Sequence, residues 1–335
     1  MPYRFPILLL ALAASLTPGW AQVAATISGR VEDQSGAALS GASVTVRNLE
    51  TGAARVVTSN ESGAFRALSL TVGPQEVRAE KAGFKTAIRT GIHLAVGQEV
   101  AVSLTLEVGE LAQQVTVVGD APLVNTSTSS VAGLVGERQI KELPLNGRSF
   151  DNLITLNPGA INYGLKSPQT STSNGNTFAV AGRRPLENLI LLNGVEYTGS
   201  SQLAVTPGGV SGDLLGIDAV REFNVLTETY PAEYGKRAGA QVSVVTQSGS
   251  NAVHGSLFEF LRNNVLDARN FFDPGPAPPF RRNQFGGALG GPLRKDRLFL
   301  FGNYEGFRER LAVSNVSVVP NGQARQGLLP NAAGV

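Results

Sequence analysis

The strongest constraint on this fold is a change of pattern near residue 254, after which apolar residues alternate with polar or small ones. Residues 255–262 place Phe258 and Phe260 at one parity and Glu259 at the other. Such alternation is typical of strands that face lipid on one side and a lumen on the other. A sheet in hydrocarbon must close on itself, because free strand edges leave backbone groups without hydrogen bonds. The carboxyl-terminal third is therefore predicted to begin a transmembrane β-barrel.

Two further segments continue this alternation. Residues 283–291 place Phe285 and Leu289 on one face and small or polar residues on the other, which leaves room inside a barrel. Residues 297–305 are strand-like, and their aromatic side chains suit the girdle of a membrane strand. Residues 254–335 hold only about three or four spanning strands, whereas the smallest such barrels need about eight. We therefore expect an incomplete barrel, from a partial reading frame or a truncated gene product.

The amino terminus predicts export. Arg4 precedes the apolar run 5–16, and Gly19 and Ala21 supply small residues at the −3 and −1 positions of a cleavage site. This pattern is typical of a secretory signal peptide, here residues 1–21. The apolar run is shorter than the roughly 18 residues that a spanning helix needs. Because no comparable run follows, any later membrane contact is expected from strands.

The amino-acid composition favours a β protein and excludes several classes of function. The chain holds 39 Gly and only 16% charged residues, which favours many short strands joined by turns. It has no Cys, which excludes disulfides, a thiolate nucleophile and a Cys-ligated metal site. Its formal charge is +2, without the Lys/Arg cluster that a nucleic-acid partner would require.

Residues 22–109 predict a small folded unit of their own. Short alternating segments are separated by Gly, Asn and Ser-rich turns at intervals of about 8 to 12 residues, the spacing of a two-sheet sandwich. About seven strands are expected in about 85 residues. The clearest of these strands lie at residues 26–31, 43–47, 55–58, 76–80 and 99–106.

Four short motifs in this unit resemble the carboxypeptidase-regulatory-like domain, which has a carbohydrate-binding-like fold. The motifs lie at residues 29–31, 41–44, 62–65 and 81–84. Saccharide sites favour exposed aromatic faces, and the region offers only Phe65 and Phe84, which we interpret as core residues. A spacer or docking role is therefore the preferred interpretation over sugar binding.

The segment 110–130 links this unit to the next and contains a short β-prone stretch with no obvious local partner. An unpaired strand is a template for strand addition by another chain. In position and content the stretch resembles a TonB box, which implies that a TonB-type energy-transducing protein grips it from the periplasm. The alternative is that it begins the sheet of the next domain. The candidate partner-binding residues are Gln114, Val115, Thr116, Val117 and Val118.

Residues 131–250 are similar to the plug domain of TonB-dependent receptors, which has an α+β fold. Short helices are expected at 136–144, ended by Pro144, and at 149–156, with strands or turns at 178–184, 189–195 and 217–225. The closing stretch 234–246 is among the most specific parts of the resemblance. The Ser, Thr, Asn and Gly tracts at 167–176 and 197–212 are interpreted as loops.

Catalysis finds little support in the sequence. His93 and His254 are the only histidines, neither has metal-ligand spacing, and no G-x-S-x-G elbow occurs. Asp218 and Glu222 lie four residues apart, which we interpret as a solvated helix face rather than a catalytic pair. The chain is therefore predicted not to be an enzyme, with no catalytic, metal-binding or cofactor-binding residues.

Together these segments resemble the Oar-like subset of TonB-dependent receptors: a mainly β chain with a sandwich, an α+β plug and the first strands of an incomplete barrel in residues 251–335. The resemblance implies an outer-membrane location, lipid contact, a periplasmic sandwich and active uptake of an unidentified ligand such as a saccharide, siderophore or peptide. The alternative function is a secreted or surface-attached adhesion or carbohydrate-binding module.

Overall fold

The computed structural model of this chain is mainly β, as predicted. It divides into two compact units, residues 1–256 with 287–303, and residues 257–286 with 304–335. The structure describes residues 25–109, 114–118, 131–145, 148–162, 177–197, 216–228, 230, 234–269, 271, 276–311 and 319–327. The expected signal peptide, the polar run 125–130 and the tract 167–176 lie outside these residues, as does most of the tract 197–212.

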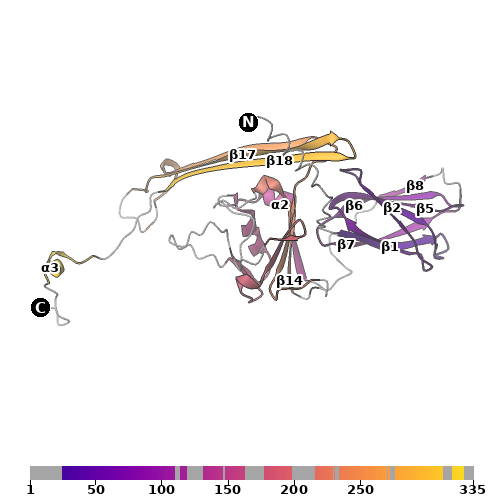
Figure 1. Ribbon diagram of the computed structural model, residues 1–335, viewed down its shortest axis with the longest axis horizontal. Coiled ribbons are helices and arrows are strands. Elements are labelled where there is room, and N and C mark those ends of the chain that lie inside the picture. The colour runs from indigo at the N-terminus through magenta and orange to yellow at the C-terminus, as the bar shows by residue number, and fades with distance from the viewer. Residues whose placement is uncertain are drawn as a thin grey trace, which may run out of the picture. The chain divides into compact units, whose positions relative to one another are not determined.

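The amino-terminal region is the predicted two-sheet sandwich (Figure 1). One sheet has the order β4-β1-β7 and the other β3-β2-β5-β6-β8. Seven strands were expected, and an eighth, β8, joins the second sheet. The strands are β1 (Ala25–Asp33), β2 (Ser43–Asn48), β3 (Ala54–Thr58), β4 (Ala64–Leu70), β5 (Gly73–Glu80), β6 (Thr86–Leu94), β7 (Glu99–Leu106) and β8 (Gln114–Val118).

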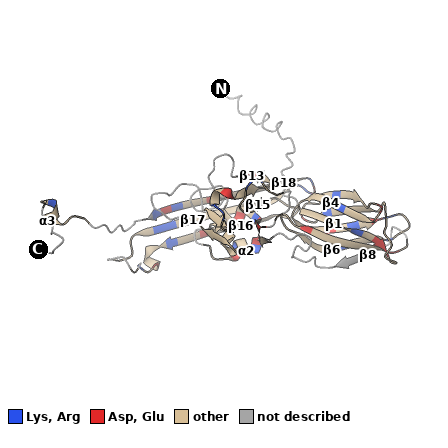
Figure 2. Ribbon diagram, turned by 90° about the horizontal axis from the view of Figure 1, so that it is seen from below, with Lys and Arg blue, Asp and Glu red and all other residues tan. Residues whose placement is uncertain are grey.

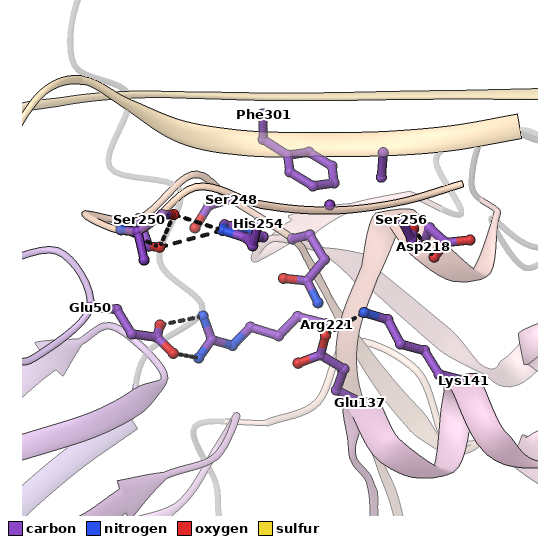
Figure 3. A pocket seen from close by; sticks show the side chains of 14 residues that line it. Glu50, Glu137, Lys141, Asp218, Arg221, Ser248, Ser250, His254, Ser256 and Phe301 are labelled. Atoms are coloured by element: carbon purple, nitrogen blue, oxygen red, sulfur yellow. Dashed lines mark hydrogen bonds and ion pairs between the residues drawn. The ribbon is translucent and has the colours of Figure 1, made fainter. Parts of the chain in front are cut away.

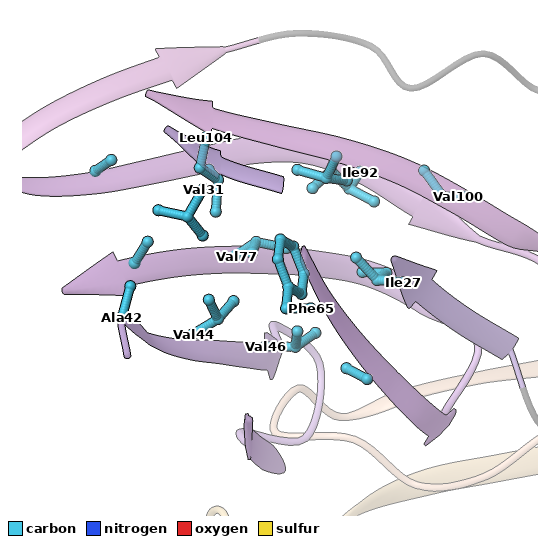
Figure 4. Close-up of a cluster of buried hydrophobic side chains, with 14 of the residues drawn as sticks. Ile27, Val31, Ala42, Val44, Val46, Phe65, Val77, Ile92, Val100 and Leu104 are labelled. Carbon is cyan, nitrogen blue, oxygen red and sulfur yellow. The ribbon is translucent and has the colours of Figure 1, made fainter. Parts of the chain in front are cut away.

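Alternation along these strands builds one core between the two sheets (Figure 4). In β7 the even-numbered positions from Val100 to Leu106 are buried, while Ala101, Ser103 and Thr105 are exposed. Phe65 lies in the same core and Phe84 packs against it, which confirms their interpretation as core residues. Each fully buried Val, Ile or Phe contributes about 1.5–3 kcal/mol relative to exposure, so this region is held by burial rather than by disulfides.

The middle region is built on a five-stranded sheet of order β13-β12-β15-β14-β9. Helix α2 (Glu137–Glu142) confirms the first predicted helix, whereas the second forms a 3-10 helix, η2 (Phe150–Leu156). The 3-10 helix packs on the sheet through Phe150 and Phe223, whose ring centroids are 5.8 Å apart. The remaining elements are β9 (Val131–Val135), β10 (Ala160–Asn162), β11 (Phe178–Val180), η3 (Pro185–Glu187), β12 (Leu189–Leu192), β13 (Val195–Glu196), η4 (Ile217–Ala219), β14 (Val220–Glu228) and β15 (Gln241–Thr246).

The predicted Asn-Gly turn joins β12 to β13. Asn193 and Gly194 both have positive φ, at 51° and 82°, which is the conformation that a two-residue hairpin turn needs. The Asn193 side chain also accepts a hydrogen bond from the Thr246 amide at 3.0 Å. The turn is thereby fixed to the end of β15.

The carboxyl-terminal region has three neighbouring strands, β16 (His254–Asn263), β17 (Phe280–Arg294) and β18 (Leu298–Leu311). Figure 1 shows β17 and β18 as two long strands side by side. The faces of β17 alternate as predicted, because Leu289 is 65% exposed whereas Gln284 is 4% exposed. In β16 the residues of opposite parity also differ, but Phe258 lies on the less exposed face, and Leu257 and Glu259 lie on the exposed one. Short helices η5 (Asn264–Leu266) and α3 (Gly322–Arg325) accompany these strands. Within the described residues, no helix has the length and apolar character needed to cross a membrane.

Candidate functional site

A polar pocket of about 400 Å³ lies where the sandwich, the middle sheet and the start of the carboxyl-terminal sheet meet (Figure 3). The sandwich supplies Glu50, helix α2 supplies Glu137 and Lys141, and β17 and β18 supply Ala288 and Phe301. The rest of the lining comes from η4, the start of β14, the segment before β16 and the first residues of β16: Asp218, Arg221, Gln247, Ser248, Ser250, Ala252, His254, Gly255 and Ser256.

A bidentate ion pair between Glu50 and Arg221 is the centre of this site (Figure 3). The Arg221 guanidinium donates to both carboxylate oxygens of Glu50, at 2.8 and 3.0 Å. Its side chain is only 15% exposed. Charge-assisted bidentate pairs of this kind are both strong and geometrically specific.

The turn after β2 positions Glu50. The buried Asn48 side chain accepts hydrogen bonds from the amides of Glu50 and Thr51, each at 3.0 Å. The Glu50 carbonyl in turn accepts from the Asn251 amide at 2.8 Å. Because both its side chain and its backbone are held, Glu50 ties the sandwich to β14 through Arg221 and to the segment before β16 through Asn251.

A second tie is formed by Glu222, the next residue on β14. Its carboxylate accepts a hydrogen bond from the Val96 amide at 2.6 Å, and Asn224 donates to the Val96 carbonyl at 3.2 Å. Burial raises the pKa of Glu222, although the Val96 hydrogen bond and nearby Arg221 favour its charged form. A small apolar cluster of Val72, Val96 and Val245 packs in this region. The sandwich is therefore docked on the middle sheet by polar and apolar contacts together.

Asp218 organises the opposite wall of the pocket. Arg148 donates to one carboxylate oxygen of Asp218, and the Ser256 hydroxyl donates to the other at 2.6 Å. Asp218 and Glu222 are both buried, Asp218 in the 3-10 turn η4 and Glu222 in strand β14. The interpretation of these two carboxylates as a solvated helix face is therefore wrong. It failed because a spacing of four residues does not by itself establish a helix.

The histidines occupy separate positions in this region. His254 stacks on Phe301 with ring centroids 6.4 Å apart, so Phe301 lines the pocket instead of a membrane girdle, contrary to expectation. Burial, reinforced by the positive charge of Arg221, lowers the pKa of His93.

Throughout the described parts of the chain, no group of three or more His, Asp or Glu residues is arranged to hold a metal ion. The charged side chains of the pocket pair mainly with one another, an arrangement suited to holding parts together.

The predicted partner-binding residues form β8, outside this pocket. Gln114–Val118 pairs in parallel with β6, from Thr86 opposite Gln114 to Thr90 opposite Val118. The expectation of a strand without a local partner is therefore wrong, and β8 also does not begin the next sheet, which contains β9 instead. Among the described strands, β8 is the last of its sheet, so its outer backbone edge faces no neighbour.

Comparisons with known proteins agree with this architecture. Residues 26–107 match the family model of the carboxypeptidase regulatory-like domain, and residues 245–334 match that of an outer membrane beta barrel domain. The TonB-dependent transporter Oar of Myxococcus xanthus is 29% identical over 313 residues, which cover 88% of this chain and 28% of the relative. The chain thus spans less than a third of that curated relative.

Among solved structures, the siderophore receptor PirA from Acinetobacter baumannii is 21% identical with a TM-score of 0.38, covering 54% of this chain and 25% of that one. The outer membrane transporter YddB from Escherichia coli is 15% identical with a TM-score of 0.38, covering 53% and 26%. The family matches and the curated relative confirm the predicted resemblance and the outer-membrane location. The chain is similar along most of its length to a TonB-dependent transporter, with a regulatory-like sandwich before an outer-membrane β-barrel segment.

Proposed function

We propose that this chain is the amino-terminal part of an outer-membrane transporter that takes up a ligand actively. The middle region then acts as the plug of the barrel, and the sandwich lies in the periplasm. The similarity to a transporter over 88% of the chain supports this proposal. The proposed segments are 1–21 as signal peptide, 22–109 as sandwich, 110–130 as linker, 131–250 as plug and 251–335 as the start of the barrel.

The proposed partner is a TonB-type energy-transducing protein that binds Gln114–Val118 by strand addition. One observation carries this assignment: β8 is the terminal strand of its sheet among the described strands and precedes the middle sheet in the chain. A partner strand added to its open edge gains main-chain hydrogen bonds, and side-chain contacts then provide specificity.

Site-directed crosslinking tests the partner assignment. Because the chain has no Cys, Val117→Cys provides a single thiol for a crosslinker, in membranes that contain the energy-transducing protein. We expect an adduct at position 117 that a synthetic peptide of residues 110–120 suppresses. Val56→Cys is the matched control, because Val56 is exposed on β3, the edge strand at the other end of the same sheet. Equal adducts at both positions, or none at 117, contradict the assignment.

A further inference from the structure

The outer surface of the second compact unit has an apolar zone. Leu257, Leu261 and Tyr304 are 92%, 67% and 66% exposed. Phe285 and Tyr304 lie together, with ring centroids 6.4 Å apart. Gln284 lies on the other face of β17 and is buried. The exposed face has the apolar and aromatic character expected of a lipid-facing surface.

Three arginines continue this face beyond the aromatic pair. Arg281 shares the parity of Phe285 on β17, and Arg308 and Arg310 share the parity of Tyr304 on β18. All three are exposed. Figure 2 shows the positive residues of this hairpin in blue.

The register brings two of these arginines together. Arg282 of β17 forms an ion pair with Glu309 of β18. A Cβ atom added at Gly306 of β18 would meet the ring of Phe285 of β17. Arg282 is therefore opposite Glu309, and Phe285 is opposite Gly306. The same register places Arg281 opposite Arg310. Like charges directly opposite on neighbouring strands repel and destabilise a sheet. An anion between them would remove this cost.

Within the described residues, neither Arg281, Arg308 nor Arg310 forms an ion pair. The arginines on the opposite face of these strands do form ion pairs, Arg282 with Glu309 and Arg262 with Asp267. The acidic residue of the outer face of β16, Glu259, is also not joined to them. The cluster is therefore a concentration of positive charge without a paired acid, beside the apolar zone of the same face.

Strand geometry places this cluster at the level of lipid headgroups. Membrane barrels have short periplasmic turns and longer external loops. β17 and β18 are joined by the short turn 295–297, whereas β16 and β17 are separated by residues 264–279, so the arginines lie toward the external side. Arg308 follows Tyr304 by four residues, about 13 Å along the strand and about 10 Å along the membrane normal. This distance carries Arg308 from an aromatic girdle into the polar headgroup layer.

We propose that Arg281, Arg308 and Arg310 form a binding site for the phosphate groups of an anionic lipid in the outer leaflet. Guanidinium groups bind phosphate through paired hydrogen bonds, and the adjacent Phe285, Tyr304 and Leu261 surface contacts the acyl chains. Its residues are distinct from the proposed partner strand Gln114–Val118. It anchors this hairpin at a fixed depth in the membrane.

Binding of lipid A to the full chain in mixed micelles tests this site. We expect a variant with Arg281, Arg308 and Arg310 all replaced by Gln to bind lipid A about 100-fold more weakly, at about fivefold per arginine. The matched control replaces Arg47, Arg55 and Arg138 by Gln, which removes the same charge from the other compact unit and is expected to leave the affinity unchanged. Dephosphorylated lipid A should bind equally weakly to all three proteins.

Equal lipid A affinities for the triple variant and the parent chain would overturn the proposal, as would an equal loss in the control. Arg281→Gln alone provides a second test that does not depend on the triple variant folding. Without lipid A, this substitution removes the repulsion with Arg310 and is expected to raise the thermal unfolding midpoint. Lipid A is expected to raise the midpoint of the variant by less than it raises the midpoint of the parent chain. A lower midpoint without lipid would contradict the assigned register.

Discussion

The ion pair between Glu50 and Arg221 leads to a quantitative prediction about how firmly the sandwich is docked. Hydrogen bonds to charged groups contribute about 1.5–3 kcal/mol each when water is partly excluded. Arg221 is largely buried, but about a third of the Glu50 side chain is exposed, so solvent reduces the combined effect. Arg221→Ala is therefore expected to weaken docking by about 2 kcal/mol, or about 30-fold in the docking equilibrium.

Thiol labelling measures this equilibrium directly. Val72 is buried in the cluster with Val96 and Val245, so Val72→Cys reacts with a maleimide only when the sandwich is undocked. Arg221→Ala is expected to raise its labelling rate about 30-fold, in proportion to the undocked fraction. Ala79→Cys provides the control, because Ala79 lies in the sandwich core and reacts only when the sandwich itself unfolds.

A double-mutant cycle separates the ion pair from general loosening. Once either partner is absent, removing the other eliminates no further attraction, so Glu50→Ala with Arg221→Ala should label no faster than the faster single variant. Additive effects of the two substitutions would refute the reasoning. So would a labelling rate at Val72→Cys that is unchanged by Arg221→Ala.

Two further predictions concern the buried carboxyl of Glu222 and the close approach of a neighbouring strand to Gly29. Burial raises the pKa of Glu222 above its ordinary value of 4.5. The contribution of Glu222 to stability is therefore full at pH values below 4.5 and is lost as the pH rises through the pKa of the folded state. Relative to Glu222→Gln, the thermal unfolding midpoint of the parent chain should fall as the pH rises above about 4.5. Gly29→Ala would place a Cβ atom 1.8 Å from the Val102 carbonyl oxygen, and we expect it to destabilise the sandwich by at least about 2 kcal/mol, measured by chemical unfolding. Gly235→Ala is its control, because a Cβ atom there meets no neighbour within 4 Å; equal midpoints for the two variants would contradict the close approach of β1 and β7.

The sandwich and the barrel strands were predictable because their signals are local. Alternation along β7 identifies its buried face without knowledge of its neighbours, and turn glycines mark the ends of the strands. The parity of residues 283–291 likewise follows from the chain alone, since successive strand residues face opposite sides. The direction of a side chain in a strand follows from its position along that strand. The position does not indicate which distant segment the strand or side chain will contact.

The docking contacts could not be predicted from the sequence. Glu50 and Arg221 are separated by 171 positions, and no alternation or motif indicates that they meet. Glu222 and Asp218 are of residue types that usually lie at the surface, yet both are buried, and each has hydrogen-bond partners in distant segments. The parallel pairing of β8 with β6 was missed for a related reason: the two strands are joined by a long connection that passes through β7.

The arrangement of β8, β9 and β14 indicates how a pull by the proposed partner would be distributed. Tension applied at β8 reaches β9 through the linker, and reaches the sandwich through the hydrogen-bonded ladder between β8 and β6. The sandwich is held to β14 by Arg221 and Glu222, and β14 is the antiparallel neighbour of β9. Both routes therefore meet at the pair formed by β9 and β14. The sandwich restrains β14 while the linker pulls β9, so the pull loads the hydrogen bonds between β9 and β14. β9 is a five-residue edge strand, and its pairing with β14 is the first part of the middle sheet expected to separate.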